Sequence, residues 1–158
     1  MTARFSWFAA AQPEDLTGLR LLMELSALRK LADRGLSDQE LALIKNLADA
    51  TMRSAKRGDV LGFLQADMTL HLCLLELTGD PALSEIARLL LAPDPVHAPP
   101  AVESVDLMAR EAREHRELVD LLADDRLSAA DDLLRLHLSR LPAGRVAPAR
   151  LARPEAGA

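Results

Sequence analysis

Residues 59–79 read DVLGFLQADMTLHLCLLELTG, and their pattern decides the fold of the chain. Side chains that would share one face recur every three or four positions, at Phe63, Asp67, Leu70, His71, Leu74 and Leu77. This period is that of an α-helix, which Asp59 can cap and Gly79 can end. The stretch therefore predicts one helix whose inward face carries a carboxylate and an imidazole one turn apart.

Helical periodicity continues on both sides of this stretch. The other expected helices begin at Pro13, at the capping box Ser37 to Glu40, at Asp80-Pro81, at about Ser104 and at Ser128, and end near Gly35, at Gly58, before Pro93, near Asp124 and at Pro142. Caps, glycines and prolines mark these boundaries. β-Branched and aromatic residues are scarce, so no strand is expected. The chain is predicted to be all-α, an antiparallel bundle of about six helices.

The expected domain organisation is a single helical unit over residues 13–142. Residues 1–12 form a short N-terminal extension. Residues 143–158 contain arginines and prolines without an apolar period, which predicts a disordered tail. A chain of 158 residues is long enough for one domain with a substantial core and short for two.

Composition narrows the possible partners and the compartment. The formal net charge is −5 and only 3% of residues are aromatic, whereas nucleic-acid-binding domains usually present a basic stripe or aromatic platforms. We therefore expect no direct DNA binding by this chain. The single cysteine, Cys73, excludes an internal disulfide and is typical of a reducing compartment. No apolar run approaches the length of a membrane span, so a cytoplasmic protein without a membrane partner is predicted.

Histidines give the clearest chemical signal. His71 lies one turn after Asp67, His115 is in register with Met108, Ala112, Leu118 and Leu122, and His137 is in register with Ala130, Leu133, Leu134 and Leu141. A buried carboxylate is costly without a partner. One carboxylate and three imidazoles suit a divalent ion such as Zn, Ni, Mn or Fe, with positions left for water or a ligand. Spacing alone leaves a simpler alternative open, in which Asp67 only hydrogen-bonds a histidine of the core.

Signals of catalysis are missing from the sequence. There is no Gly-rich phosphate loop and no nucleophile elbow. A di-iron bundle needs Glu three residues before His on two helices, but those positions hold Met68, Ala112 and Leu134. We therefore do not expect an enzyme. A metal-assisted enzyme remains the alternative from another class, and a helical dimerisation module with structural histidines is a third.

Five short motifs follow one another between Glu14 and Leu141. They are LRLLME at 19–24, DMTLH at 67–71, TGDP at 78–81, EHR at 114–116 and LHL at 136–138. In order and spacing this series resembles the FCD domain, the ligand-sensing half of the FadR subfamily of GntR-type bacterial transcription regulators. No single motif is specific, but the series together is.

The resemblance implies a metal site and an effector. In that family the Asp and His of the second motif and two later histidines hold a divalent metal inside a helical bundle, and small carboxylates or sugar acids often complete the coordination. Carried over, the metal ligands are Asp67, His71, His115 and His137, with Zn, Ni or Mn as the expected ion. His97 matches no ligand position. A symmetric homodimer is also expected, because the domains of this family pair through their helices.

Arg20 belongs to the first motif and allows two interpretations. It lies four residues before Glu24, which fits an ion pair on a helix surface worth at most about 0.5 kcal/mol. A guanidinium can instead bind the carboxylate of an effector through two hydrogen bonds. The resemblance favours this role in the pocket, and Arg20 is predicted to bind the ligand.

The chain departs from the family pattern at several places. Leu70 stands for the usual Phe, and Asp80 for the usual Asn. Prolines between Pro93 and Pro100 should shorten the fourth helix, which helps to form the pocket. Regulators of this family carry a winged helix-turn-helix before the sensor domain, but only 12 residues precede Pro13. The expectation is a sensor without its own DNA-binding domain, either a stand-alone protein or a truncated regulator.

Overall fold

The computed structural model describes residues 13–91 and 104–140. Its helices are α1 (Pro13–Arg34), α2 (Asp38–Arg57), α3 (Val60–Glu76), α4 (Pro81–Leu91), α5 (Val105–Ala123) and α6 (Leu127–Ser139). These described residues contain no strand, which confirms the all-α prediction. The expected N-terminal extension, the proline-rich stretch with His97 and the expected tail lie outside the described residues.

Local signals define the ends of α2 as predicted. The Ser37 hydroxyl accepts a hydrogen bond from the Glu40 backbone N–H, and the Glu40 carboxylate accepts one from the Ser37 N–H at 2.8 Å. This reciprocal capping box satisfies two donors that a helix start leaves unpaired. Gly58 ends the helix with φ of 64°, a left-handed conformation that glycine adopts without steric cost.

Two predicted boundaries need correction. α3 ends at Glu76 rather than at Gly79, because the N–H groups of Thr78 and Gly79 bond to carbonyls three residues back in a tightened last turn. α6 begins at Leu127, and its N-cap is Arg126 rather than Ser128. The preceding turn is closed by a bond from the Arg126 N–H to the carbonyl of Leu121 at 2.9 Å, so the new helix starts directly after it.

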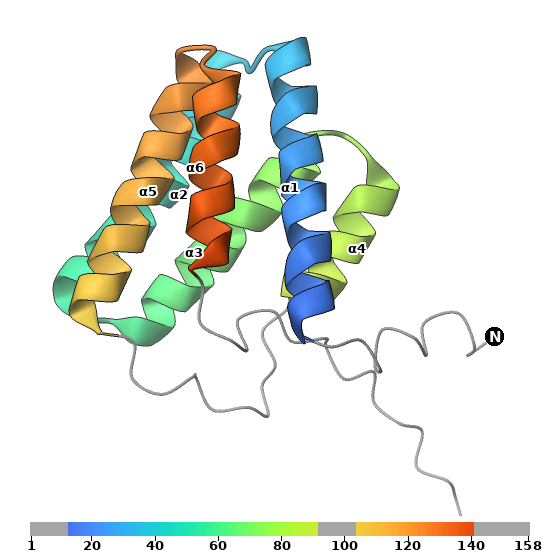
Figure 1. Cartoon of the computed structure of the whole chain (residues 1–158). Helices are drawn as coiled ribbons and strands as arrows, with labels where there is room; N and C mark the ends of the chain where they lie inside the picture. The colour runs from blue at the N-terminus through green and yellow to red at the C-terminus, as the bar shows by residue number, and fades with distance from the viewer. Residues whose placement is uncertain (1–12, 92–103, 141–158) are drawn as a thin grey trace, which may run out of the picture.

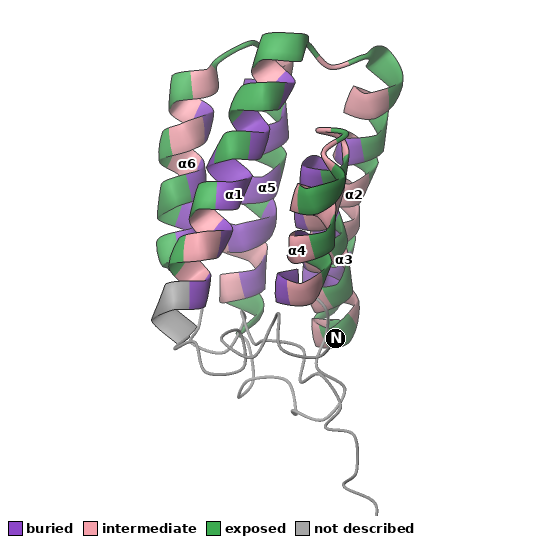
Figure 2. Ribbon diagram, turned by 90° about the vertical axis from the view of Figure 1, so that its right-hand side faces the viewer, coloured by how far each residue is buried: buried purple, intermediate pink, exposed green. Residues whose placement is uncertain are grey.

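The helices pack side by side as a bundle (Figure 1). α2 packs against α3 and α5, while α1 packs against α3, α4 and α6. Figure 2 shows the buried positions along the inward faces of the helices and the exposed positions on their outer faces. The largest apolar cluster includes Leu28, Leu31, Ile44, Leu70, Leu74, Leu118, Leu122 and Leu134. None of the helices in 13–91 and 104–140 is long and apolar enough to span a bilayer.

Candidate metal centre

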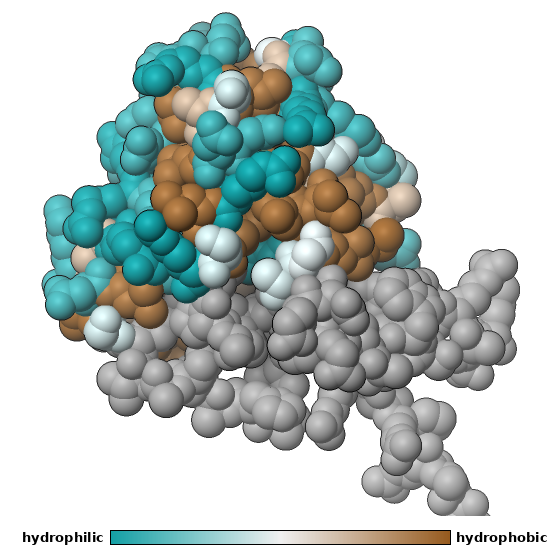
Figure 3. Space-filling view, viewed as in Figure 1, coloured by the Kyte–Doolittle hydropathy of each residue, from teal (hydrophilic) through white to brown (hydrophobic). Residues whose placement is uncertain are grey.

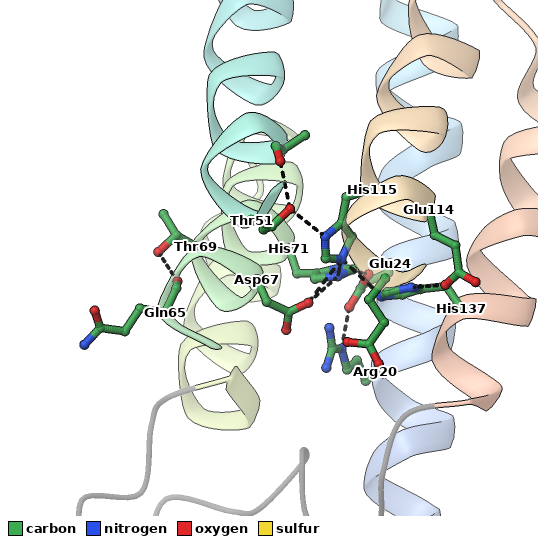
Figure 4. Close-up of polar contacts among 12 residues, drawn as sticks. Arg20, Glu24, Thr51, Gln65, Asp67, Thr69, His71, Glu114, His115 and His137 are labelled. Carbon is green, nitrogen blue, oxygen red and sulfur yellow. Dashed lines mark hydrogen bonds and ion pairs between the residues drawn. The ribbon is translucent and has the colours of Figure 1, made fainter. Parts of the chain in front are cut away.

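The four residues predicted to bind a metal meet inside the bundle (Figure 4). α3 supplies Asp67 and His71, α5 supplies His115 and α6 supplies His137, and all four are buried. One potential ligand atom from each residue can be chosen so that all of them lie within 4.8 Å of one another. We call these four residues the Asp-His cluster.

Short distances separate the inner atoms of the Asp-His cluster. The Nε2 atom of His115 lies 3.3 Å from Nε2 of His71 and 3.3 Å from Nε2 of His137. Oδ1 of Asp67 lies 3.1 Å from Nε2 of His115 and 3.6 Å from Nε2 of His71. Three imidazole nitrogens therefore surround one point together with a carboxylate oxygen.

The outer nitrogen of each imidazole has its own partner. Nδ1 of His71 lies 2.6 Å from the Glu24 carboxylate, and Nδ1 of His137 lies 2.8 Å from the Glu114 carboxylate. An ionised carboxylate can accept hydrogen bonds but cannot donate one, so each of these Nδ1 atoms donates its proton outward. The neutral ring then carries its lone pair on Nε2, which points into the cluster.

His115 reaches the same state through a hydroxyl. Its Nδ1 lies 3.3 Å from Oγ1 of Thr51. The Thr51 hydroxyl already donates its own proton to the Ala48 carbonyl at 2.7 Å, so Oγ1 is free to accept from His115. The Phe63 ring also stacks on this imidazole, with the planes 22° apart and the centroids separated by 6.5 Å. In the tautomer that donates from Nδ1 to Thr51, His115 also directs its Nε2 lone pair inward.

Burial of the imidazoles and the contacts of Asp67 with them favour the protonation state that a metal requires. Burial lowers the pKa of His115 from 6.5 to about 4, and it also lowers the pKa of His137. For Asp67, burial acts to raise the pKa, but contact with His115 and His71 holds it well below its usual value. The centre thus combines neutral imidazoles at His115 and His137 with an ionised Asp67, and imidazole and carboxylate are donors that Zn²⁺, Ni²⁺ and similar ions accept.

The chemistry of these donors tests whether a cation fits. Four potential ligand atoms converge, and in the tautomers that donate outward from Nδ1 no imidazole proton lies between them. Lone pairs at 3.3 Å repel one another unless a proton or a positive ion lies among them. The residues present therefore fit a divalent cation. A hydrogen bond between Asp67 and His115 would relieve part of the repulsion if His115 took a proton at Nε2.

Arg20 is buried, and the alternative of a surface ion pair is therefore wrong. Only 2% of its side chain is exposed, and its Nε donates to Oε1 of Glu24 at 2.6 Å. The other oxygen of Glu24 is the one that accepts from His71. Burial alone would raise the pKa of Glu24, but His71 and Arg20 lower it to about 2. Nη2 of Arg20 is buried and has no hydrogen-bond partner within the described residues.

Sequence reasoning missed the residues that orient the imidazoles, namely Glu24, Thr51 and Glu114. A signal for Glu24 was present, because it continues the inward register Leu16, Arg20, Glu24, Leu28 and Leu31. A charged pair in such a stripe predicts a buried polar network. Glu114 was visible only as a neighbour of His115, and Thr51 only as one inward position of its helix.

Comparison with known proteins gives one match. The family model described as FCD domain matches residues 15–140, which include all four residues of the Asp-His cluster and Arg20. No curated protein and no solved structure matches the chain.

Proposed function

Since this chain belongs to the FCD domain family, the ligand-sensing domain of GntR-type transcription regulators, we propose that it senses a small carboxylate or sugar acid through a bound divalent metal. Asp67, His71, His115 and His137 would hold the ion, with Zn, Ni or Mn as the candidates. The convergence of three Nε2 atoms and one carboxylate oxygen is the observation on which this proposal rests. The members of this family are transcription regulators and not enzymes, which supports sensing over catalysis.

Arg20 supports a negatively charged effector. Its guanidinium is buried beside the cluster, and Nη2 lacks a hydrogen-bond partner among the described residues. A buried donor without a partner costs free energy, and a carboxylate would satisfy it with a charge-assisted hydrogen bond. The metal would offer open coordination positions to the same ligand. The effector would thus be bound by the metal and by Arg20 together.

Signalling would follow from the position of the cluster between helices. Its residues lie on α3, α5 and α6, and Glu24 extends the network to α1. A ligand that binds one packing of these helices more tightly shifts the population toward that packing. In regulators of this kind, such a shift would alter how the attached DNA-binding domains are presented.

The proposed assembly is a symmetric homodimer. Leu22 on α1 is 67% exposed and Leu136 on α6 is 43% exposed, and α1 packs against α6. Figure 3 shows apolar side chains gathered over α1, α6 and α4 on one face of the molecule. An exposed apolar face of this kind suits a twofold interface, in which the same patch of each copy meets its counterpart.

Metal content and thermal stability test the proposed function. Elemental analysis of the purified chain should find a transition metal, and Zn or Ni should raise the melting temperature relative to chelator. At a metal concentration about a hundredfold above Kd, the gain in unfolding free energy is about 2.7 kcal/mol. His115→Ala should abolish most of this gain. His97→Ala is the matched control, because His97 matches no ligand position, and it should respond to metal as the wild type does.

A chain without bound metal would contradict the proposed function. If the wild-type chain contains no metal and chelator leaves its melting temperature unchanged, the histidines are structural. The contact of Asp67 with His115 at 3.1 Å would then be a hydrogen bond within the core, and the metal-dependent sensor would be rejected.

A further inference from the structure

We propose that Glu24 is a positioning residue that couples metal affinity at His71 to anion binding at Arg20. One carboxylate serves both groups, since Oε2 lies 2.6 Å from Nδ1 of His71 and Oε1 lies 2.6 Å from Nε of Arg20. Figure 4 shows this chain of contacts running from the imidazole cluster to the guanidinium. The proposal rests on the proposed function, because it assumes that the Asp-His cluster binds a metal.

Glu24 differs from the two other groups that orient imidazoles. Its side chain is 1% exposed, so water screens its charge very little. Glu114 is 10% exposed and also contacts Arg140 at 3.2 Å and Arg110 at 3.6 Å, and both arginines are partly exposed to solvent. Thr51 is neutral and lies 3.3 Å from its imidazole. Glu24 therefore makes the shortest of the three contacts to Nδ1, and the more buried of the two that a carboxylate makes.

The contact between Glu24 and His71 should set the strength of one metal ligand. A carboxylate that accepts the Nδ1 proton fixes the tautomer and the ring orientation, and it raises the basicity of Nε2. Because Glu24 belongs to α1 and His71 to α3, the orientation of this ligand depends on how the two helices pack. A shift of α1 relative to α3 would therefore change the orientation of His71 in the cluster.

Arg20 connects this contact to an anion. Its Nε is used by Glu24, whereas its buried Nη2 makes no hydrogen bond to any described residue. An anion at Nη2 would draw part of the positive charge of Arg20 away from Glu24. The Glu24 carboxylate would then interact more strongly with the Nδ1 proton of His71, and Nε2 would become a better donor. Since binding free energies are reciprocal, anion and metal should strengthen each other.

Zinc affinity with and without malonate tests the coupling in the full chain. Zinc binding is measured by competition with a chromophoric chelator, and malonate is the probe anion. Glu24→Gln keeps the shape of the side chain and removes its charge, so it should lower zinc affinity by about 10- to 100-fold. It should also reduce the increase in zinc affinity that malonate causes in the wild type, leaving only the part that direct coordination of malonate to the metal supplies. Glu114→Gln should weaken zinc binding but retain the malonate effect.

Two further variants separate positioning from general damage. Glu76→Gln removes an exposed carboxylate of α3 that pairs with Arg88, and it should match the wild type in both measurements. Arg20→Lys keeps a positive charge beside Glu24 without the planar fork, and its malonate effect should fall below that of the wild type. The absorption spectrum of bound Co²⁺ adds a readout of ligand geometry, which Glu24→Gln should change and Glu76→Gln should not.

Each outcome decides the proposal. Wild-type zinc affinity in Glu24→Gln, or an undiminished malonate effect in both Glu24→Gln and Arg20→Lys, would overturn the coupling while leaving the metal site intact. If Glu24→Gln does not fold, an undiminished malonate effect in Arg20→Lys overturns the coupling by itself. A wild-type chain that binds no zinc would instead reject the proposed function.

Discussion

The metal-free domain should lose stability as the pH falls from 6.5 toward 4, because His115 is buried as a neutral imidazole. The side chain is fully buried, and its pKa is lowered from 6.5 to about 4. In the unfolded chain the same imidazole takes up a proton near pH 6.5. Between these two values the unfolded state binds more protons than the folded state, so acid favours unfolding.

The sign and the size follow from this difference. The contribution is fully present above pH 6.5, declines through the interval and is lost below about pH 4. A fall in pKa from 6.5 to about 4 corresponds to about 3 kcal/mol, at about 1.4 kcal/mol for each tenfold change. The local slope is therefore about 1.4 kcal/mol per pH unit for one proton. His137, whose pKa burial also lowers, should add to this slope.

Urea denaturation in the presence of chelator measures the effect. Unfolding free energies at pH 7, 6, 5.5 and 5 avoid the range in which unfolded carboxyl groups titrate. His115→Gln should reduce the slope by about 1.4 kcal/mol per pH unit, the contribution of one proton. His97→Gln should keep the slope of the wild type. Saturating zinc should flatten the curve near neutral pH, since the metal holds the imidazoles in the neutral form.

A flat profile in chelator between pH 6.5 and 5 would refute the reasoning. It would mean that the cluster binds as many protons in the folded state as in the unfolded state. The inward lone pairs, and with them the fit of a cation, would then have to be abandoned.

Three other perturbations test the packing, the assembly and a helix cap. Phe63→Ala should cost about 3–5 kcal/mol in urea denaturation, since the ring is fully buried; a loss under about 1 kcal/mol would contradict the packing. Leu22→Glu should shift the mass in light scattering toward the monomer, whereas Leu61→Glu, similarly exposed on α3, should not. Equal masses for the two variants would argue against the proposed interface. The bond from Arg34 helps to hold the pKa of Glu40 at about 2, so the difference in melting temperature between wild type and Glu40→Gln should be full above pH 4.5 and shrink toward pH 2; a constant difference would exclude this charge effect.

The helices could be predicted because their signals are local. Ser37 and Glu40 lie three residues apart and cap α2 as expected, and Gly58 ends it in the left-handed conformation. The prediction that Ser128 caps α6 was wrong, since the helix begins at Leu127. The turn before it is closed by backbone hydrogen bonds, which the side-chain pattern does not predict.

The proposed metal ligands could be predicted in part. Asp67 and His71 share one face of one helix, and their proximity follows from helical geometry alone. His115 and His137 lie on other helices, so their approach to this pair was expected from the family resemblance rather than from spacing. The match of the FCD family model to residues 15–140 confirms that resemblance.

Tertiary packing alone decided which group holds each imidazole. Glu24 is 47 residues from His71 along the chain, Thr51 is 64 from His115, and Glu114 is 23 from His137. These contacts determine where each lone pair points, and they form only when helices pack to within a fraction of an ångström. Packing also made Arg20 and Glu24 a buried pair, although their spacing is equally suited to a helix surface. Periodicity shows which residues share a face, but the neighbouring helix supplies the partner and excludes the water.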